Sequence, residues 1–360
     1  MLNPGNATAG LARWVHTSDL RADLKYATDR LDLVARPRTL ARQRSGGVTR
    51  TREHESFLTQ GYVRWRPSQA LTATAGRELF SRGPANFRSP SSPFYFDAGR
   101  TDPLREVSGI DLVRLGAALG QQTATLAHVL GSGHGLAADP HRDTTVVRVD
   151  HRLSSALLGL VLAPQRRASG FAGGFGQVAI GEAWLVYSEF GLQRLASQLL
   201  PSADLGAAPY SLRKPWERAL VSLVGTAYTL EGGQTVVAEL LRDGHGLAPA
   251  AARTYFDRAA LLGSSPLLGL ALGQAPRLLS RNYLYLHAQG NPNATGSFWR
   301  VSWTANFDDR SGQLAFYNQR NISNRWTLFA QWSLNHGSAR SEYRALFPSA
   351  FTRGAKVFVY

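Results

Sequence analysis

The 360-residue chain contains no cysteine, which excludes disulfide bonds, thiolate metal sites and cysteine nucleophiles. Long apolar runs are also missing. The longest lies near Ala156 to Ala163 and is far shorter than the 18 or more residues that a membrane-spanning helix needs. The mean hydropathy of −0.20 agrees with this. The chain is therefore not a helical membrane protein, but a membrane barrel remains open because only every second residue of its strands must be apolar.

Lysine is almost absent, occurring only as Lys25, Lys214 and Lys356, so 37 of the 40 basic residues are arginine and the net charge is +15. Such a balance often indicates a nucleic-acid partner. Here the arginines are scattered, with no basic helix, no RNP-like aromatic motif and no Cys/His finger, so no nucleic acid is expected. Three explanations stay open: an interior that attracts anions, outer loops that pair with lipopolysaccharide phosphates, and the arginine bias of a GC-rich genome.

The last sixty residues alternate between apolar and polar side chains. One series sets Trp299, Val301, Trp303 and Ala305 between Arg300, Ser302, Thr304 and Asn306, and a second sets Trp326, Leu328, Ala330, Trp332 and Leu334 between Thr327, Gln331, Ser333 and Asn335. Period-two alternation predicts β-strands with one apolar and one polar face. A tryptophan-rich apolar face opposite charges and amides is typical of a membrane β-barrel, with lipid outside and water inside.

The same pattern recurs along the chain and predicts an all-β fold, a single transmembrane antiparallel up-and-down β-barrel over residues 1–360. Strands are expected at 20–28, 29–36, 56–66, 70–78, 110–119, 122–131, 143–152, 155–163, 173–180, 183–192, 219–229, 234–242, 281–290, 297–306, 312–319, 325–335 and 351–360, with a weaker one near 10–16. Because single-chain bacterial barrels have even strand numbers, we expect about 18 strands, with 16 or 14 as alternatives.

The connections between these strands alternate in length. If the C-terminal strand ends in the periplasm, the turns on that side are nearly all short, whereas those on the other side are mostly long. Long outer loops are expected at 37–55, 79–109, 193–218 and 243–280, and Pro249 to Leu262 has the spacing of a short helix. Short periplasmic turns and long outer loops are the bacterial pattern.

The C-terminal segment resembles the β-signal of bacterial outer-membrane proteins. It has a glycine, alternating hydrophobic residues and a terminal aromatic residue, at Gly354, Phe358 and Tyr360, whereas Lys356 stands where that signal is usually apolar. The segment that follows Gly76-Arg77 is similar to segments of porin-like and alginate-export-like barrels. The resemblance implies a Gram-negative outer-membrane location, with the lipid bilayer, lipopolysaccharide and the barrel-assembly machinery as partners.

Loop 79–109 is rich in proline, aromatic residues and charge, so we expect it to pack on itself. If it folds inward as in porins, it narrows the pore, and strand 155–163, apolar on both faces, needs such a cover. The expected pore-lining residues are Arg64, Arg77, Glu78, Arg82, Arg88, Asp97, Arg100, Arg105, Arg148 and Glu239. Arginine rings suit anion pathways. The alternative is that the loop charges pair with each other and hold the loop outside the barrel.

We therefore expect a passive channel for hydrophilic, anionic solutes rather than an enzyme, with no cofactor and no metal. Two alternatives remain: a plugged structural or surface-binding barrel, and a lipid hydrolase using His336 and Ser338 near Asn335, which have the required His-x-Ser spacing. The solute and the oligomeric state are not predicted. No signal peptide is visible after Met1, so we expect either a mature chain or a truncated one.

Overall fold

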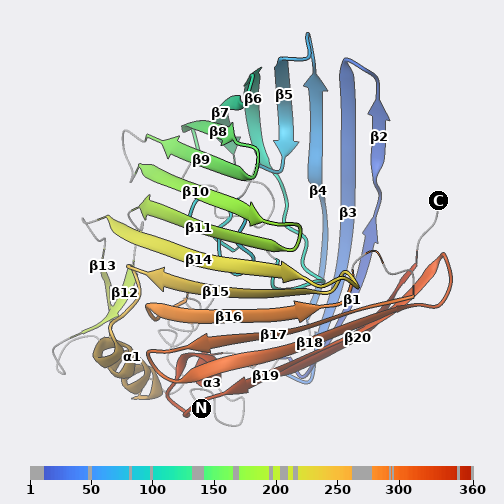
Figure 1. Ribbon diagram of the computed structural model, residues 1–360. Helices are drawn as coiled ribbons and strands as arrows, with labels where there is room; N and C mark the ends of the chain where they lie inside the picture. Colours follow the sequence, from blue (N-terminus) through green and yellow to red (C-terminus); the bar gives the residue numbers. More distant parts are fainter. Residues whose placement is uncertain are drawn as a thin grey trace.

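The computed structural model describes residues 12–47, 51–80, 83–97, 100–131, 142–164, 170–193, 198–202, 210–213, 218–261, 278–291, 293, 296–346 and 349–357. The strands are β1 (Trp14–Arg21), β2 (Leu24–Ala27), β3 (Leu31–Ser45), β4 (Thr51–Trp65), β5 (Leu71–Glu78), β6 (Ile110–Leu119), β7 (Gln122–Gly131), β8 (Thr145–Arg152), β9 (Ala156–Ala163), β10 (Phe171–Ile180), β11 (Trp184–Gln193), β12 (Gln198–Pro201), β13 (Tyr210–Arg213), β14 (Ala219–Thr229), β15 (Thr235–Asp243), β16 (Asn282–Gln289), β17 (Ser297–Asn306), β18 (Ser311–Asn321), β19 (Trp326–His336) and β20 (Ala350–Val357). Two helices, α1 (Pro249–Leu261) and α3 (Glu342–Leu346), lie in the connections (Figure 1).

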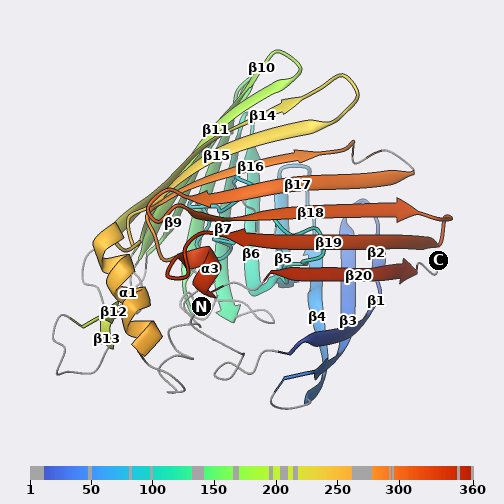
Figure 2. The same cartoon turned by 90° about the horizontal axis from the view of Figure 1, so that it is seen from below.

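Eighteen of these strands form one antiparallel sheet in which, from β2 onward, each strand pairs with the next strand of the sheet along the chain. The small hairpin of β12 and β13 stands apart, so β11 pairs directly with β14. β1 and β2 both pair with β3 in one unbroken register and are interrupted only opposite Pro37, which has no N–H to donate. The meander thus has 17 positions, and it curves so that β20 approaches the first strands (Figure 2). The all-β fold with eighteen strands is confirmed.

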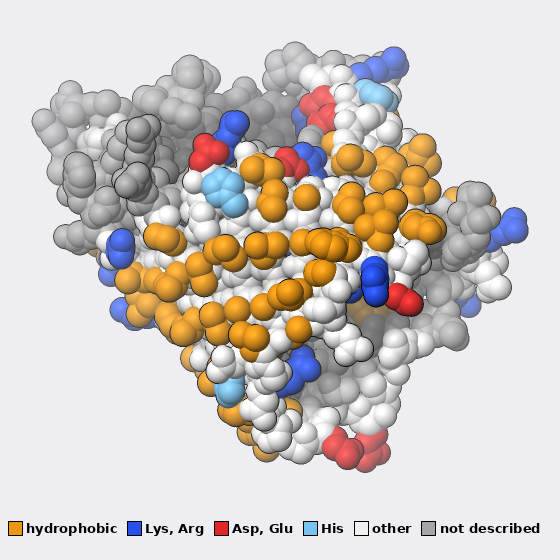
Figure 3. Space-filling view, turned by 90° about the horizontal axis from the view of Figure 1, so that it is seen from above, with side chains coloured by type: hydrophobic (Ala, Val, Ile, Leu, Met, Phe, Trp, Pro, Cys, Tyr) orange, Lys and Arg blue, Asp and Glu red, His pale blue; other side chains and the backbone are white. Residues whose placement is uncertain are grey.

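Register gives every strand an outward and an inward face. On β15 the side chain of Leu240 is 54% exposed, whereas Leu241, the next residue, is 2% exposed. The adjacent β14 repeats this with Val224 and Leu223. Rows of hydrophobic side chains consequently cover the outward face (Figure 3). The expected outward placement of the alternating tryptophans, Trp299 among them, is also confirmed.

The connections on one side of the sheet are tight turns. Those after β6 and β10 are closed by Gly120 and Gly181, whose φ angles of 62° and 65° lie in the left-handed region that glycine enters without strain. The turns at this side of the sheet are short, as expected from the sequence. Within the described residues, no helix is long and apolar enough to cross a membrane.

The opposite side differs from the expectation in one place. Residues 37–45 and 51–55, expected in an outer loop, continue β3 and β4 as a paired hairpin. Successive side chains still point to opposite faces there, but both faces are polar. The hairpin sequence therefore lacks the apolar and polar alternation from which the other strands were predicted. A bulge at Thr59 also turns Phe57 inward, against Arg38, although a regular strand would place Phe57 on the same outward face as Val63. The helix expected after Pro249 is confirmed as α1.

Candidate functional site

The connection between β5 and β6 lies inside the curved sheet. Ala85 and Phe87 of this loop pack among inward side chains of β11, β14 and β16, and the ring of Phe87 stacks on that of Tyr285 with centroids 5.3 Å apart. Farther along, Phe94 and Tyr95 pack against Val161 of β9 in a second buried cluster. The strand that was apolar on both faces is therefore covered by an inward-folded loop, as its sequence required.

Two carboxylates on the inward face hold this loop. Glu239 of β15 accepts hydrogen bonds from the backbone nitrogens of Asn86 and Phe87, each at 2.6 Å, and from the hydroxyl of Tyr187 at 2.5 Å. Glu239 is 1% exposed, so both of its oxygens are committed to protein donors. We predicted Glu239 as a pore-lining charge, whereas the structure shows it as an anchor for the loop.

The second anchor is Glu189 of β11. Its Oε1 accepts from the backbone nitrogen of Ala85 at 2.7 Å, and its Oε2 accepts from the hydroxyls of Ser89 and Ser91, both at 2.7 Å. The loop approaches so closely that a Cβ on Gly191 would collide with the carbonyl of Pro90. Sequence analysis missed Glu189, because a single acid at an inward strand position has the same pattern whether it faces water or binds a loop.

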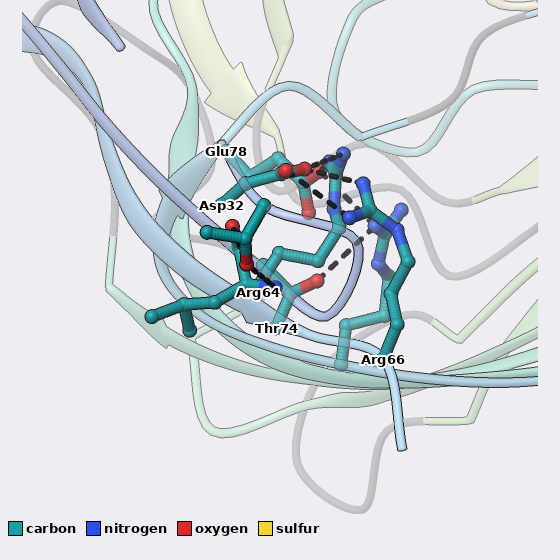
Figure 4. A network of polar contacts seen from close by, with 8 residues as sticks. Asp32, Arg64, Arg66, Thr74 and Glu78 are labelled. Atoms are coloured by element: carbon teal, nitrogen blue, oxygen red, sulfur yellow. Dashed lines mark hydrogen bonds and ion pairs between the residues drawn. The ribbon is translucent and has the colours of Figure 1, made fainter. Parts of the chain in front are cut away.

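A charged cluster lines the inward side of β3 to β6, and we term it the charged wall. Its members are Asp32, Arg64, Arg66, Thr74, Glu78 and Arg114, and five of them are labelled in Figure 4. Arg64 binds both acids, pairing with Glu78 and reaching Asp32 at 3.4 Å. Arg66 pairs with Asp32, and Arg114 lies 3.0 Å from Glu78.

The charged wall contains three guanidinium groups and two carboxylates. Asp32 and Glu78 are 5% and 4% exposed, so the acids lie beneath the longer arginine side chains. The predicted residues Arg64 and Glu78 are thus brought together, and Asp32 and Arg114 join them. For Asp32 and Arg114, the sequence indicated only that a charged residue occupies an inward position of a neighbouring strand.

Other predicted residues are engaged within the loop itself. Asp97 pairs with Arg105 at 2.7 Å and with Arg88 at 3.5 Å. Arg100 donates to the carbonyls of Pro84 and Ala85 at 2.8 and 2.6 Å. The loop charges therefore pair with each other, as the alternative stated, yet the loop lies inside. Arg82 lies outside the described residues.

Arg77 differs from the other predicted pore residues. It pairs with Asp111 at 2.8 Å and donates to the carbonyl of Leu58, which places it on the outward face, in register with exposed Ala75 and Val113. The prediction that Arg77 lines the pore is therefore wrong. Along β5, Arg77 shares the outward face with apolar residues such as Ala75, whereas Glu78 is on the inward face. Arg148 does face inward and pairs with Asp150 at 2.8 Å.

One further inward arginine, Arg300 of β17, connects the loop to the far part of the sheet. It donates to the backbone carbonyl of Arg100 at 2.6 Å and to the amide oxygen of Gln289 at 2.6 Å. Among the described residues, neither Arg300 nor Arg100 has a carboxylate within ion-pair distance. These two cations add positive charge that is not neutralised by a direct partner.

At the end with the long connections, α3 is fixed by a buried carboxylate. Glu342 accepts from the hydroxyl of Tyr283 at 2.6 Å, from Asn306 Nδ2 at 2.8 Å and from the backbone nitrogen of Leu279 at 2.9 Å. Burial raises the pKa of Glu342 to about 7, which outweighs these hydrogen bonds. Asp309, whose charge also raises this pKa, lies close by and accepts from the Glu342 backbone nitrogen.

The residues of the hydrolase alternative do not converge. Asn335 faces inward and accepts from Gln313, whereas His336 is on the opposite face and accepts from the indole of Trp303 at 3.1 Å. A nucleophile, base and orienting amide must share one face to act together. Because strand alternation separates two of the three groups, this geometry gives no support to lipid hydrolysis.

The assembly signal expected at the C-terminus is described only in part. Gly354 pairs with Phe329 on β19, and the space where its Cβ would stand is filled by the Phe329 ring. Lys356 also faces inward, with its ammonium 5.5 Å from the centre of that ring. An inward position explains why a charge is tolerated there. Phe358 and Tyr360 lie outside the described residues.

The described residues thus form an antiparallel meander with an apolar outward face, a charged inward face and a loop folded inside, an architecture similar to that of porin-like β-barrels. No protein-family model matches the sequence, and no curated protein matches it. The structure is similar to OccAB1 of Acinetobacter baumannii, with 10% identity over 97% of this chain and 96% of that one, and a TM-score of 0.46. It is also similar to OccK7 (OpdD) of Pseudomonas aeruginosa, with 11% identity, 90% and 88% coverage and a TM-score of 0.49. It is similar as well to a mutant Rh. blastica porin, with 10% identity over 98% of this chain and 94% of that one, and a TM-score of 0.45. The likeness concerns the arrangement of the strands.

Proposed function

We propose that the chain is a channel of the bacterial outer membrane that lets hydrophilic, anionic solutes pass by diffusion. The observation that carries this proposal is the charged wall on the inward face of a sheet whose outward face is apolar. Charged side chains in contact with water inside and hydrocarbon side chains in contact with lipid outside are what a water-filled barrel requires. A barrel of 16 to 18 strands is wide enough for an aqueous channel.

The preference for anions is supported by the balance of charge. Three arginines of the charged wall face two carboxylates, and Arg100 and Arg300 add cations held by carbonyl and amide oxygens. Glu189 and Glu239 direct their carboxylate oxygens at backbone and hydroxyl donors of the loop, so these oxygens are not available to contact a solute. Guanidinium groups bind carboxylate and phosphate in two-point geometry, and exposed ones exchange them readily.

The partners follow from the two surfaces. The hydrophobic outward rows would contact the hydrocarbon of the bilayer, and Arg77 with Asp111, near the end of β5 that leads into the long connection, would lie at the level of lipopolysaccharide head groups. Gly354, with Phe358 and Tyr360, would present the signal read by the barrel-assembly machinery. Heat-modifiable migration on a detergent gel tests the barrel itself, since a soluble protein would not show it.

Planar-bilayer recording tests the channel. We expect stepwise conductance and, across a salt gradient, a reversal potential on the anion side. A cation-side potential would contradict the anion preference, and zero conductance from protein that migrates as a folded barrel would contradict the channel.

A plugged barrel with a structural or surface-binding role is the second candidate, and one observation favours it. Buried apolar clusters that include Phe87, Phe94 and Tyr285 fill part of the interior. The same recording decides between the two, because a plug that stays in place carries no current.

A further inference from the structure

The outward face of β18, β19 and β20 carries positive charge. Arg320 of β18 and Arg353 of β20 are exposed, and their cross-strand partners Leu328 and Ala330 belong to the outward face of β19. Cross-strand partners share one face of a sheet, so both arginines face outward. Arg325 adds a third exposed cation in the tight turn between β18 and β19. We term these three arginines the outward arginine cluster.

The cluster extends from the tight turn to the middle of the strands. Counted from that turn, the outward side chains of β19 are Trp326, Leu328, Ala330, Trp332 and Leu334. Arg353 is level with Ala330, the third of these five. A guanidinium at this level of a lipid-facing wall is unfavourable unless it reaches polar groups. Long arginine side chains extend along apolar surface toward the head groups, and the other two arginines lie on the tight-turn side of Arg353.

Arg320 and Arg353 stand at opposite corners of a small patch. Arg320 is in register with Leu328 and Ala355, and Arg353 is two residues from Ala355 along β20. Their Cα atoms are thus offset by about 9.6 Å across the strands and about 6.8 Å along them. Ala330 and Ala355 have short side chains, so the two long arginine side chains can approach a common ligand above them.

The cluster has no acidic partner among the described residues. Between residues 281 and 360 the only acids are Asp308, Asp309 and Glu342. All three lie at the far end of these strands from the tight turn, in the connection after β17 and in α3. By contrast, the outward Arg77 is paired with Asp111. The guanidinium groups of the cluster are therefore left to bind an external anion.

Apolar rings lie next to the cluster. Toward the outer end of the strands, Phe316, Trp332 and Phe351 form an exposed row of neighbouring rings, with centroids 5.5 and 4.9 Å apart. Toward the tight turn, the indole of Trp326 is 50% exposed, and such indoles favour the membrane–water interface. The wall thus presents cations toward one head-group region and apolar rings nearer the bilayer interior, which is the order of groups along a phospholipid.

We propose that the outward arginine cluster binds one anionic phospholipid of the leaflet on the tight-turn side. The phosphate lies between Arg320 and Arg353, Arg325 attracts the anionic head group, and the acyl chains cover the row of aromatic rings. Guanidinium groups bind phosphate through paired, charge-assisted hydrogen bonds. The proposal rests on the proposed function, because it requires the outward face to contact lipid.

Charge complementarity favours a lipid over a second copy of this chain. A rotation axis along the membrane normal brings together residues of equal depth. Asp111, the outward carboxylate of the described strands, lies at the end of β6 away from the tight turns and is already paired with Arg77. A symmetric oligomer would therefore place no carboxylate against Arg320 or Arg353.

Binding is tested with phosphatidylglycerol, titrated into the detergent-folded barrel and counted by native mass spectrometry. We expect one tightly held molecule, and binding at least about tenfold weaker in the double variant Arg320→Gln, Arg353→Gln, which loses two charge-assisted contacts. Arg30→Gln, at an exposed arginine in the tight turn between β2 and β3, is the matched control and should bind as the unsubstituted chain does. Equal binding by the double variant and the control would overturn the proposal. So would equal retention of phosphatidylcholine by the unsubstituted chain.

The position of the lipid is tested with phosphatidylglycerol that carries a photoactivatable acyl chain. Cross-linked peptides should map to the strands that contain Phe316, Trp332 and Phe351. Equal labelling of all strands would overturn the proposal. Inorganic phosphate in large excess should not displace the lipid, because it has no acyl chain to cover the aromatic rings. Displacement would identify a site for free phosphate and would also overturn the proposal.

Failure of this proposal can be told apart from failure of the proposed function. The double variant should show the same heat-modifiable migration and conductance as the unsubstituted chain, because neither arginine faces the interior. A chain that lacks heat-modifiable migration would contradict the barrel itself. A folded, conducting barrel without a preference for phosphatidylglycerol would overturn the lipid site alone. Dimers in detergent that disappear in the double variant would also overturn it, because a second copy would then cover this face.

Discussion

The side-chain carboxylate of Glu239 lies 2.6 Å from the backbone nitrogen of Phe87, a residue 152 positions earlier in the chain. This contact joins the middle of the loop that follows β5 to the inner wall at β15. With the matching contact of Glu189 to Ala85, it holds the loop inside the barrel rather than over its mouth. The interior is thus shaped by two buried acids whose partners are mainly backbone and hydroxyl groups of one loop.

Replacing Glu239 by alanine should loosen the loop. The substitution leaves the backbone N–H groups of Asn86 and Phe87 without their acceptor, at a cost of about 1–3 kcal/mol for each buried donor. We expect larger and noisier single-channel conductance and a lower free energy of unfolding. Glu231→Ala, at an exposed turn, is the matched control. Unchanged current noise in a folded Glu239→Ala barrel would show that the loop does not depend on this anchor.

The charged wall should set ion selectivity in opposite directions for opposite substitutions. Glu78→Gln removes the acid that neutralises Arg64 and Arg114, so the reversal potential should move further to the anion side. The double variant Arg64→Gln, Arg114→Gln should move it toward cations. Arg52→Gln, whose side chain is exposed on the outward face of β4, should leave it unchanged. Shifts of the same sign in both wall variants would mean that the wall does not contact the ion path.

The outward face should reject charge. Leu240→Arg places a guanidinium among the exposed apolar side chains of β15, and near mid-depth such a substitution costs about 2–4 kcal/mol. We expect the urea midpoint of the protein in lipid vesicles to fall accordingly. Leu240→Phe keeps the surface apolar and should unfold near the midpoint of the unsubstituted protein. An arginine variant as stable as the phenylalanine variant would be incompatible with a lipid-facing β15.

The docking of α3 should weaken as pH rises. Burial raises the pKa of Glu342 to about 7 from an ordinary value near 4.5, so the folded protein holds the proton more tightly than the unfolded chain does. The stabilising effect of the proton is complete below pH 4.5 and is lost as pH rises through 7, by roughly 3 kcal/mol in all. The protection factors of residues 341–346, which are exchange rates corrected for the intrinsic pH dependence of amide exchange, should therefore be higher at pH 5 than at pH 8.

Glu342→Gln provides the check on that pH dependence. The amide cannot titrate, so the difference in protection factor between pH 5 and pH 8 should largely disappear. Asp309 is the other acid near this carboxyl group, and the phenols of Tyr283 and Tyr343 also lie close to it. A dependence that persists in Glu342→Gln would show that Glu342 is not its cause.

Strand positions were predictable because alternation is a local property of the backbone. The limits expected for 110–119, 122–131, 219–229 and 297–306 are those of β6, β7, β14 and β17. The prediction was wrong at 37–55. Both faces of the β3–β4 hairpin are polar there, so its successive residues do not alternate between apolar and polar side chains. The face of Arg77 was also predicted wrongly. A charged residue of a strand is expected to face inward, and only its ion pair with Asp111 shows that Arg77 can lie on the outward face.

The contacts of the inward acids could not be predicted in the same way. Asp32, Glu78, Glu189 and Glu239 are all acids at inward strand positions, and nothing in the order of residues separates them. The first two lie beneath arginines of neighbouring strands, and the last two bind a loop. Only the three-dimensional approach of the loop distinguishes an acid that pairs with neighbouring strands from one that binds the loop.

By itself, the sequence determined for most strand positions which side chains face outward and which face inward, and where the tight turns fall, because each depends on residues a few positions apart. The tertiary structure decided that the loop after β5 lies inside and that arginines such as Arg66 and Arg105 have carboxylate partners. These features rest on contacts such as those of Arg66 with Asp32 and Glu239 with Phe87. A contact between residues far apart in the chain depends on the curvature and register of the whole sheet, which no local pattern encodes.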